Sequence, residues 1–161
     1  MPKVDVIANL RTARARLLEA IDGLTDDHML QVGAVGIWSV KDVLAHLVAW
    51  EAELVTALSR LEQHKRTPPR IVEIEDIDEW NDDQYRVSAA RPVDDIWEDF
   101  EGVHKHLIQA VEDLDDRTLD DNRRWPWMEG EPLSYLIDEN AIWHEEEHAE
   151  DISNWRATQG F

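Results

Sequence analysis

Apolar residues recur every three or four positions in four stretches of the chain, with polar residues between them. The first stretch carries Ile7, Leu10, Ala13, Leu17, Ile21 and Leu24, and the second carries Val40, Leu44, Leu47, Leu54, Leu58 and Leu61. The third carries Val93, Ile96, Trp97, Phe100, Leu107, Val111 and Leu114, and the fourth carries Leu133, Ile137, Ala141, Ile152 and Trp155. This spacing places the apolar side chains on one face of an α-helix. No segment shows the alternation of a strand, so the pattern predicts an all-α four-helix bundle.

Helix-starting and helix-breaking residues bound these stretches. Gly23 and the segment up to Gly36 end the first helix. Ser39 and Asp42 resemble a capping box, with Asp in place of the usual Glu, and start a second helix that runs to about Gln63. Proline suits the first position of a helix, so Pro92 and Pro132 are expected to start the third and fourth helices.

The lengths of the connections suggest how the helices are arranged. Two connections are short and suit antiparallel neighbours, whereas about thirty residues separate the second helix from the third. Within that crossover, the spacing of Ile77, Trp80, Gln84 and Val87 is compatible with a helix. We therefore expect an up-down-down-up bundle with a long, partly helical crossover between helices 2 and 3. The length of 161 residues predicts one domain, 1–161.

Composition narrows the classes of partner. The 36 acidic and 16 basic residues give a formal net charge of −20, which predicts neither nucleic acid nor a membrane surface as a partner. The absence of cysteine excludes disulfides, thiolate metal sites and a cysteine nucleophile. The chain has neither a leader-like N-terminus nor an apolar run near the ~18 residues of a membrane span, so we expect a soluble, cytoplasmic protein.

Three histidines form a candidate metal site. His144 and His148 lie one turn apart on the core-facing side of the fourth helix, where each unsatisfied imidazole would cost about 1–3 kcal/mol. One shared metal ion would satisfy both rings, and a third protein ligand commonly completes such a site. His46 lies roughly 10 Å into the second helix, and His148 lies roughly 14 Å from the end of the antiparallel fourth helix, so their heights match.

Alternatives to this histidine site remain open. His104 also faces the core, but it lies roughly 18 Å along the third helix and would need a vertical offset to join the pair. The histidines at 28, 64 and 106 are expected at the surface or in loops. Core histidines held only by hydrogen bonds are the alternative to a metal site. The spacing is not that of the His-Glu-x-x-His motif, because three residues separate His144 from His148.

Other polar residues are candidates for catalysis. Glu51 lies near the centre of the buried stripe of the second helix and within about one and a half turns of His46, where it could act as a general base. It could instead extend its carboxylate to solvent or pair with an arginine such as Arg14 or Arg16. Asn140 stands one turn before the first histidine of the pair and could orient a ligand, or satisfy its amide locally.

Aromatic residues are candidates for a pocket wall. Trp38 and Trp50 lie toward the end of the bundle that carries the histidines, and Trp80 and Asn81 on the crossover could also reach the pocket. Core packing is the alternative for the tryptophans. The loop containing Trp125 and Trp127 joins helices 3 and 4 at the opposite end, and we expect only a structural role for it.

Two runs of sequence carry a family resemblance. They are WSVKDVLAHLVAWE (38–51) and ENAIWHEEEHAEDI (139–152), which resemble the DinB/YfiT-like superfamily, especially its ClbS/DfsB-type branch. The resemblance implies an up-down-down-up bundle in which His46, His144 and His148 bind nickel, zinc or a similar ion. It implies a homodimer as well. Members include thiol-cofactor-dependent transferases and isomerases, whereas the ClbS type is linked to protection against a reactive genotoxin and can lack the triad.

These features together give two principal hypotheses for function. The first is a metal-dependent enzyme, a thiol transferase or hydrolase that acts on a small electrophilic molecule, with one divalent transition metal and a low-molecular-weight thiol as cofactors. Three neutral imidazoles leave the charge of the ion uncompensated, so a bound water or thiol would lose its proton more readily. The alternative is a non-catalytic protein of the ClbS type that sequesters a small molecule. A structural or interaction protein, with a large exposed apolar patch and no pocket, is a third reading. Three imidazoles suit zinc, nickel, copper and iron alike.

Overall fold

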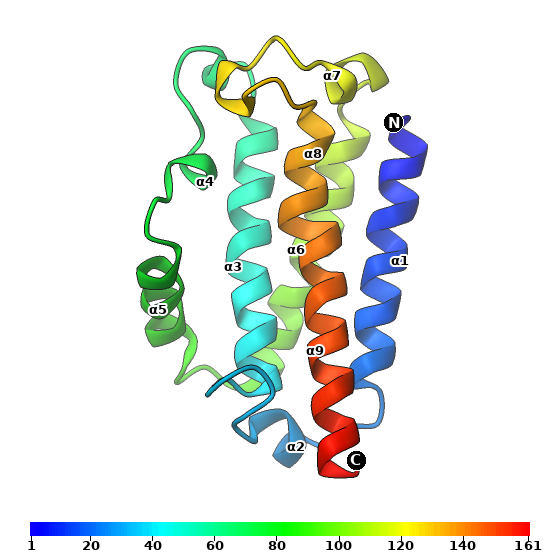
Figure 1. The fold of residues 1–161 in the computed structure, drawn as a ribbon, viewed down its shortest axis with the longest axis vertical. Helices are drawn as coiled ribbons and strands as arrows, with labels where there is room; N and C mark the ends of the chain where they lie inside the picture. The colour runs from blue at the N-terminus through cyan, green and yellow to red at the C-terminus, as the bar shows by residue number, and fades with distance from the viewer.

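Four long helices pack side by side along the molecule (Figure 1). The computed structural model describes residues 1–161. Its long helices are α1 Lys3–Ile21, α3 Val40–Ser59, α6 Val93–Glu112 and α9 Trp143–Gln159. Its shorter helices are α2 Asp26–Leu30, α4 Arg70–Glu73, α5 Ile77–Ser88, α7 Asp116–Asp120 and α8 Leu133–Ile137, with 3₁₀ turns at Gln63–Lys65 and Pro126–Met128. There is no β-strand, and the prediction of an all-α bundle is confirmed.

The directions of the helices can be followed in Figure 1. Helices α1 and α9 run in one direction, and α3 and α6 run in the other. The most extensive packing joins α3 to α6 and α1 to α9, and both are parallel pairs. The helices joined by the short connections, α1 with α3 and α6 with α9, run antiparallel as expected, but they are not the most extensively packed pairs. Each of those connections contains a short helix, α2 or α7, and so allows the chain to cross the end of the bundle.

The crossover between α3 and α6 lies against one side of α3 (Figure 1). It contains α4 and α5, so the predicted helical character of this segment is confirmed. None of the residues of α5 is buried, and the side chain of Ile77 at its start is 52% exposed. Helix α5 therefore covers the bundle from outside, whereas Ile71 of α4 is buried in the core.

The core consists of two apolar clusters stacked along the bundle. One contains Leu54, Leu107, Trp125 and Leu133, and the other contains Leu17, Leu44, Phe100 and Ile152. Fully burying such a side chain contributes about 1.5–3 kcal/mol, so these residues hold the helices in register. None of the helices has both the length and the hydropathy that crossing a bilayer would require.

The start of α3 is fixed by the predicted capping box. The backbone N–H of Asp42 donates to Ser39 Oγ at 3.1 Å, while the backbone N–H of Ser39 donates to Asp42 Oδ2 at 3.0 Å. These bonds satisfy two amide groups that would otherwise lack partners at the helix terminus. Because the first turn is held, His46 has a defined position less than two turns into the helix.

A π-helical turn over Asp138–Ile142 joins α8 to α9. Such a turn inserts one extra residue into a helix and rotates everything after it by roughly 100° relative to what precedes it. The apolar spacing predicts one regular α-helix here, so the inserted residue is a difference between the structure and that prediction. The turn ends two residues before His144, so it sets which face of α9 carries the histidine pair.

Candidate functional site

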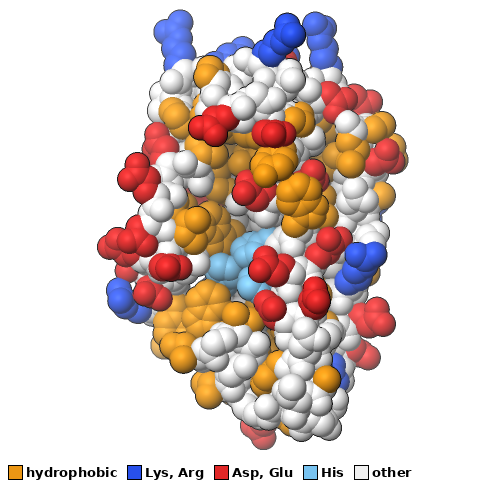
Figure 2. Space-filling model, viewed as in Figure 1, with side chains coloured by type: hydrophobic (Ala, Val, Ile, Leu, Met, Phe, Trp, Pro, Cys, Tyr) orange, Lys and Arg blue, Asp and Glu red, His pale blue; other side chains and the backbone are white.

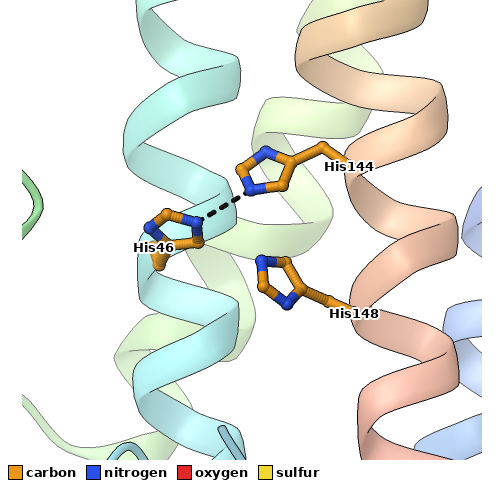
Figure 3. Close-up of side chains that lie close together, drawn as sticks. All are labelled: His46, His144 and His148. Atoms are coloured by element: carbon orange, nitrogen blue, oxygen red, sulfur yellow. Dashed lines mark hydrogen bonds between the residues drawn. The ribbon is translucent and has the colours of Figure 1, made fainter. Parts of the chain in front are cut away.

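Three imidazole rings from two helices converge beside α3 (Figure 3). His46 of α3 and His144 of α9 have their Nε2 atoms 2.8 Å apart, and one nitrogen from each of the three rings lies within 4.8 Å of the others. The ring centroid of His148 is 5.2 Å from that of His46. No other group of three or more such side chains in the chain has comparable geometry, and His104 stands apart from the three.

Each of the three rings also has a polar neighbour outside the cluster. Nδ1 of His148 lies 3.1 Å from Asp151 Oδ2, while the backbone of Asn140 and the side chain of Asn81 lie close enough to the rings of His144 and His46 to raise the pKa of each ring slightly. In Figure 3 the second ring nitrogen of His46 points away from His144. Metal-binding histidines usually have the outer nitrogen held in this way, which fixes the ring and leaves the inner nitrogen free.

Burial determines the charge of two of these rings. It is the largest cause lowering the pKa of His46 to about 3, and the neighbouring His144 and His148 lower it further. Burial and His148 likewise lower the pKa of His144 to about 4. Both rings are therefore neutral at pH 7, which is the form of imidazole that binds a metal ion.

A cavity of about 650 Å³ opens at the three histidines. It lies between α3, the crossover, and the continuous helical segment formed by α8, the π-helical turn and α9. In Figure 2 the histidine surface is visible at the base of a hollow. Its lining residues are His46, Trp50, Ile71, Val72, Ile74, Ile77, Asn81, Trp127, Glu129, Leu136, Glu139, Asn140, His144, Glu147 and His148. A second surface cavity, of about 820 Å³ between α1 and α9, contains none of the three histidines. The chemistry and the space for a small ligand therefore coincide in the first cavity.

The structure brings the three residues expected to wall the pocket together around His46. The Nε1 atom of Trp50 donates to Asn81 Oδ1 at 2.8 Å, and both residues line the cavity. The ring of Trp38 lies 4.8 Å from the ring of His46 but does not line the cavity. Asn140 does line it, while its Nδ2 donates to the carbonyl of Leu136 at 2.9 Å, the local bond considered as its alternative.

Glu51 lies in a buried charge cluster and does not line the cavity. Its carboxylate is fully buried, lies 3.7 Å from Arg14 Nη2 and accepts no hydrogen bond. Burial, followed by the nearby Glu145, raises the pKa of Glu51 well above its usual value. The arrangement matches the alternative of pairing with Arg14, and it leaves the carboxylate without contact to the histidines' cavity.

Several lining residues were missed from the sequence. The sequence predicts only a structural role for the loop after α7, but in the structure Trp127 of this loop lines the cavity, and its Nε1 donates to the carbonyl of His64 at 2.8 Å. Trp125 of the same loop is buried in the core as expected. The cavity extends from the histidines toward that end of the bundle, so residues distant in helix height share it. Glu129, Glu139 and Glu147 were not singled out either.

Solved structures share this fold. An uncharacterised protein from Escherichia coli UTI89 has a TM-score of 0.82 and 12% identity, with 99% of this chain and 95% of that chain covered. The sibling lethal factor precursor DfsB has a TM-score of 0.82 and 13% identity over 99% and 97% of the two chains. The colibactin self-resistance protein ClbS has a TM-score of 0.77 and 13% identity over 95% and 94%. No curated protein matches the chain.

The ClbS structure corrects one expectation. The net charge of −20 predicts that nucleic acid is not a partner, but ClbS, which has this fold, was crystallised in complex with double-stranded DNA. The exclusion is therefore wrong. It fails because a protein's total charge does not describe the local surface that a nucleic acid would contact.

The family is shown by a match that covers most of the sequence. The family model for the DinB superfamily matches residues 9–152, which span the chain from α1 to α9 and include all three histidines. This match confirms the resemblance drawn from the two runs around the histidines. The chain belongs to the DinB superfamily.

Proposed function

We propose that this protein is a metal-dependent enzyme that holds one divalent transition metal through His46, His144 and His148 and transfers a thiol to, or hydrolyses, a small electrophilic molecule. The observation that carries the proposal is the convergence of three imidazole nitrogens within 4.8 Å at the base of a cavity of about 650 Å³. Nickel and zinc both suit an all-imidazole ligand set.

The residues present fit such an ion. Three rings from two helices offer one nitrogen each, and their outer partners leave those nitrogens free to bind. When bound, the ion would act as a Lewis acid and favour loss of a proton from a thiol or water. Three ligands are also the number that catalytic zinc sites commonly use.

Other side chains of the chain would bind and orient the substrate. Trp50 and the apolar residues of the crossover would cover an apolar group and exclude water from it. The Asn140 amide at the cavity wall would orient a polar group of the substrate. Trp38 would restrain the ring of His46 from the side away from the cavity. We place Glu51 in the buried charge cluster and give it no role at the substrate, because its only ionic partner is Arg14 and it does not line the cavity.

A second candidate is a protective protein that binds a small reactive compound without turnover. The tryptophan-lined cavity and the fold shared with ClbS, a colibactin self-resistance protein, support it. In this case the metal would be dispensable for binding. A histidine variant separates the two candidates. The metal-dependent enzyme would lose product formation, whereas the sequestering protein would still bind its ligand.

The test is a turnover assay with protein loaded with nickel or zinc, a panel of small thiols and 1-chloro-2,4-dinitrobenzene as the electrophile. The variant is His144→Ala, and the matched control is His106→Ala, which removes an exposed histidine of α6. We expect product formation by the wild type and the control, and only the background rate from His144→Ala. Equal rates in all three would contradict the enzyme proposal, and ligand binding without turnover would favour sequestration.

A further inference from the structure

The charged side chains around the cavity are all acidic. Glu129, Glu139 and Glu147 line it, and no lysine or arginine does. In Figure 2, acidic side chains lie next to the histidine surface, while the lysine and arginine side chains lie toward the ends and outer edges of this face. The cavity between α1 and α9 differs, since Arg16 and Arg156 are among its lining residues. The absence of lysine and arginine therefore distinguishes the histidine cavity from the cavity between α1 and α9, although the protein as a whole is acidic.

The three glutamates come from three separate segments. Glu129 follows the Pro126–Met128 turn, Glu139 belongs to the π-helical turn, and Glu147 lies on α9 between the two histidines. None of the three carboxylates forms an ion pair or hydrogen bond with another residue of the chain. All three are exposed to solvent, so they lie where the cavity opens to the surface, and their negative charge is not compensated by another residue of the chain.

The remaining walls suit an organic cation. Ile71, Val72, Ile74 and Ile77 of the crossover give one apolar side, and Trp50 and Trp127 contribute aromatic rings. Aromatic faces attract positively charged nitrogen, and tryptophan does so most strongly. Carboxylates combined with tryptophan rings and an apolar wall are the features by which proteins bind ammonium groups that carry an apolar substituent.

We infer that the histidine cavity takes a small molecule in which a positively charged nitrogen is joined to an apolar body, with the cation beside the glutamates and the apolar part against the crossover. This inference rests on the proposed function, because it assumes that the cavity is the substrate site. It also restricts the thiol. A thiol used here would be neutral or carry an amine, since the glutamates would repel a polyanionic one.

The test compares two probes of similar size and opposite charge, benzyltrimethylammonium and phenylmethanesulfonate. A quaternary nitrogen has no lone pair to bind a metal. Binding of this probe therefore does not depend on the metal, and metal-free protein can be used. Binding is followed by NMR on ¹⁵N-labelled protein, with the indole N–H signals of Trp50 and Trp127 as reporters of the cavity. We expect the cation to bind about tenfold more tightly than the anion, with a preference that shrinks as salt is raised.

Variants separate the cavity from the overall charge of the protein. Glu139→Gln and Glu147→Gln each remove one carboxylate from the lining, and Glu150→Gln makes the same change in charge on α9 outside the cavity. We expect each lining variant to weaken cation binding about two- to fivefold and Glu150→Gln to leave it unchanged. Equal weakening by all three variants, binding of neither probe, or tighter binding of the anion would overturn the inference.

Metal stoichiometry measured on the same protein distinguishes the inference from the proposed function. One metal ion per chain without a preference for the cationic probe would overturn only the substrate class. A preference for the cationic probe in a protein that binds no metal would overturn the metal-dependent enzyme and leave the substrate class standing.

Discussion

Arg14 of α1 and Glu145 of α9 form a buried ion pair that crosses the core of the bundle. The Nη2 atom of Arg14 lies 2.7 Å from Glu145 Oε1, and its Nε donates to the same oxygen at 3.1 Å. The guanidinium also donates to the carbonyl of Phe100 at 2.9 Å and lies over that residue's ring. Glu145 directly follows His144, so this pair ties the position of the histidine helix to α1.

Removing the arginine should destabilise the fold strongly. Arg14→Met leaves Glu51 and Glu145 buried without a cation, and breaking a buried pair in this way costs about 3–5 kcal/mol. Urea denaturation of metal-free protein measures this loss. Arg16→Met is the control, because its pair with Glu146 is largely exposed and worth about 0–1 kcal/mol. Similar losses of unfolding free energy in the two variants would show that the buried pair stabilises the fold no more than the exposed one.

Glu51→Gln should raise stability at alkaline pH. The pKa of Glu51 is raised in the fold by burial and by Glu145, so the folded protein holds this proton more tightly than the unfolded chain. Its contribution is present at low pH, below the unfolded value of 4.5, and is lost as pH rises toward the raised pKa. We expect the melting temperature of Glu51→Gln to exceed that of the wild type at pH 8 and to approach it near pH 5. A lower melting temperature at every pH would contradict this account.

Metal-free protein should lose stability as the solution is acidified from pH 6.5 toward pH 4. His46 and His144 accept protons at a pKa of about 3 and about 4 in the fold, but near 6.5 in the unfolded chain. The unfolded chain therefore binds more protons at these two histidines in this interval, so they make the fold less stable as the pH is lowered. Urea denaturation at several pH values measures the slope, which should be shallower for His46→Gln. The same dependence of stability on pH in His46→Gln as in the wild type would contradict the lowered pKa of the buried His46 ring.

Asp151→Asn should weaken metal binding without removing a ligand. The carboxylate of Asp151 lies 3.1 Å from Nδ1 of His148 and fixes that ring, and losing such a partner commonly costs about 10–100-fold in metal affinity. Competition with a chelator of known affinity measures the change. Glu150→Gln, one residue away and outside the cluster, should keep the wild-type affinity. An Asp151→Asn protein with wild-type affinity would mean that the contact has no role in holding the ring.

The sequence was sufficient for the parts of the structure that depend on local spacing. The stripes of α1, α3 and α6, the capping box at Ser39 and the one-turn separation of His144 and His148 all follow from helix geometry. The match in height between His46 and the pair needed only the rise per residue and an antiparallel arrangement. The structure brings these three rings together at the predicted level.

The features that the sequence did not predict depend on tertiary contacts. The π-helical turn before His144 has no residue signature of its own, since a single inserted residue leaves most of the apolar spacing intact. The position of Trp127 in the cavity depends on how a loop folds back over the bundle. The environment of Glu51 depends on Arg14 and Glu145, which come from two other helices, so its neighbours could not be chosen from spacing alone.

Metal content of the purified, untagged protein is the most direct test of the central claim. The protein would be loaded with zinc or nickel, passed over a desalting column and measured by elemental analysis, alongside His144→Ala, His148→Ala and the control His106→Ala. The account predicts one metal ion per chain in the wild type and the control, and almost none in the two variants of α9. Unchanged metal content in both of those variants would contradict it.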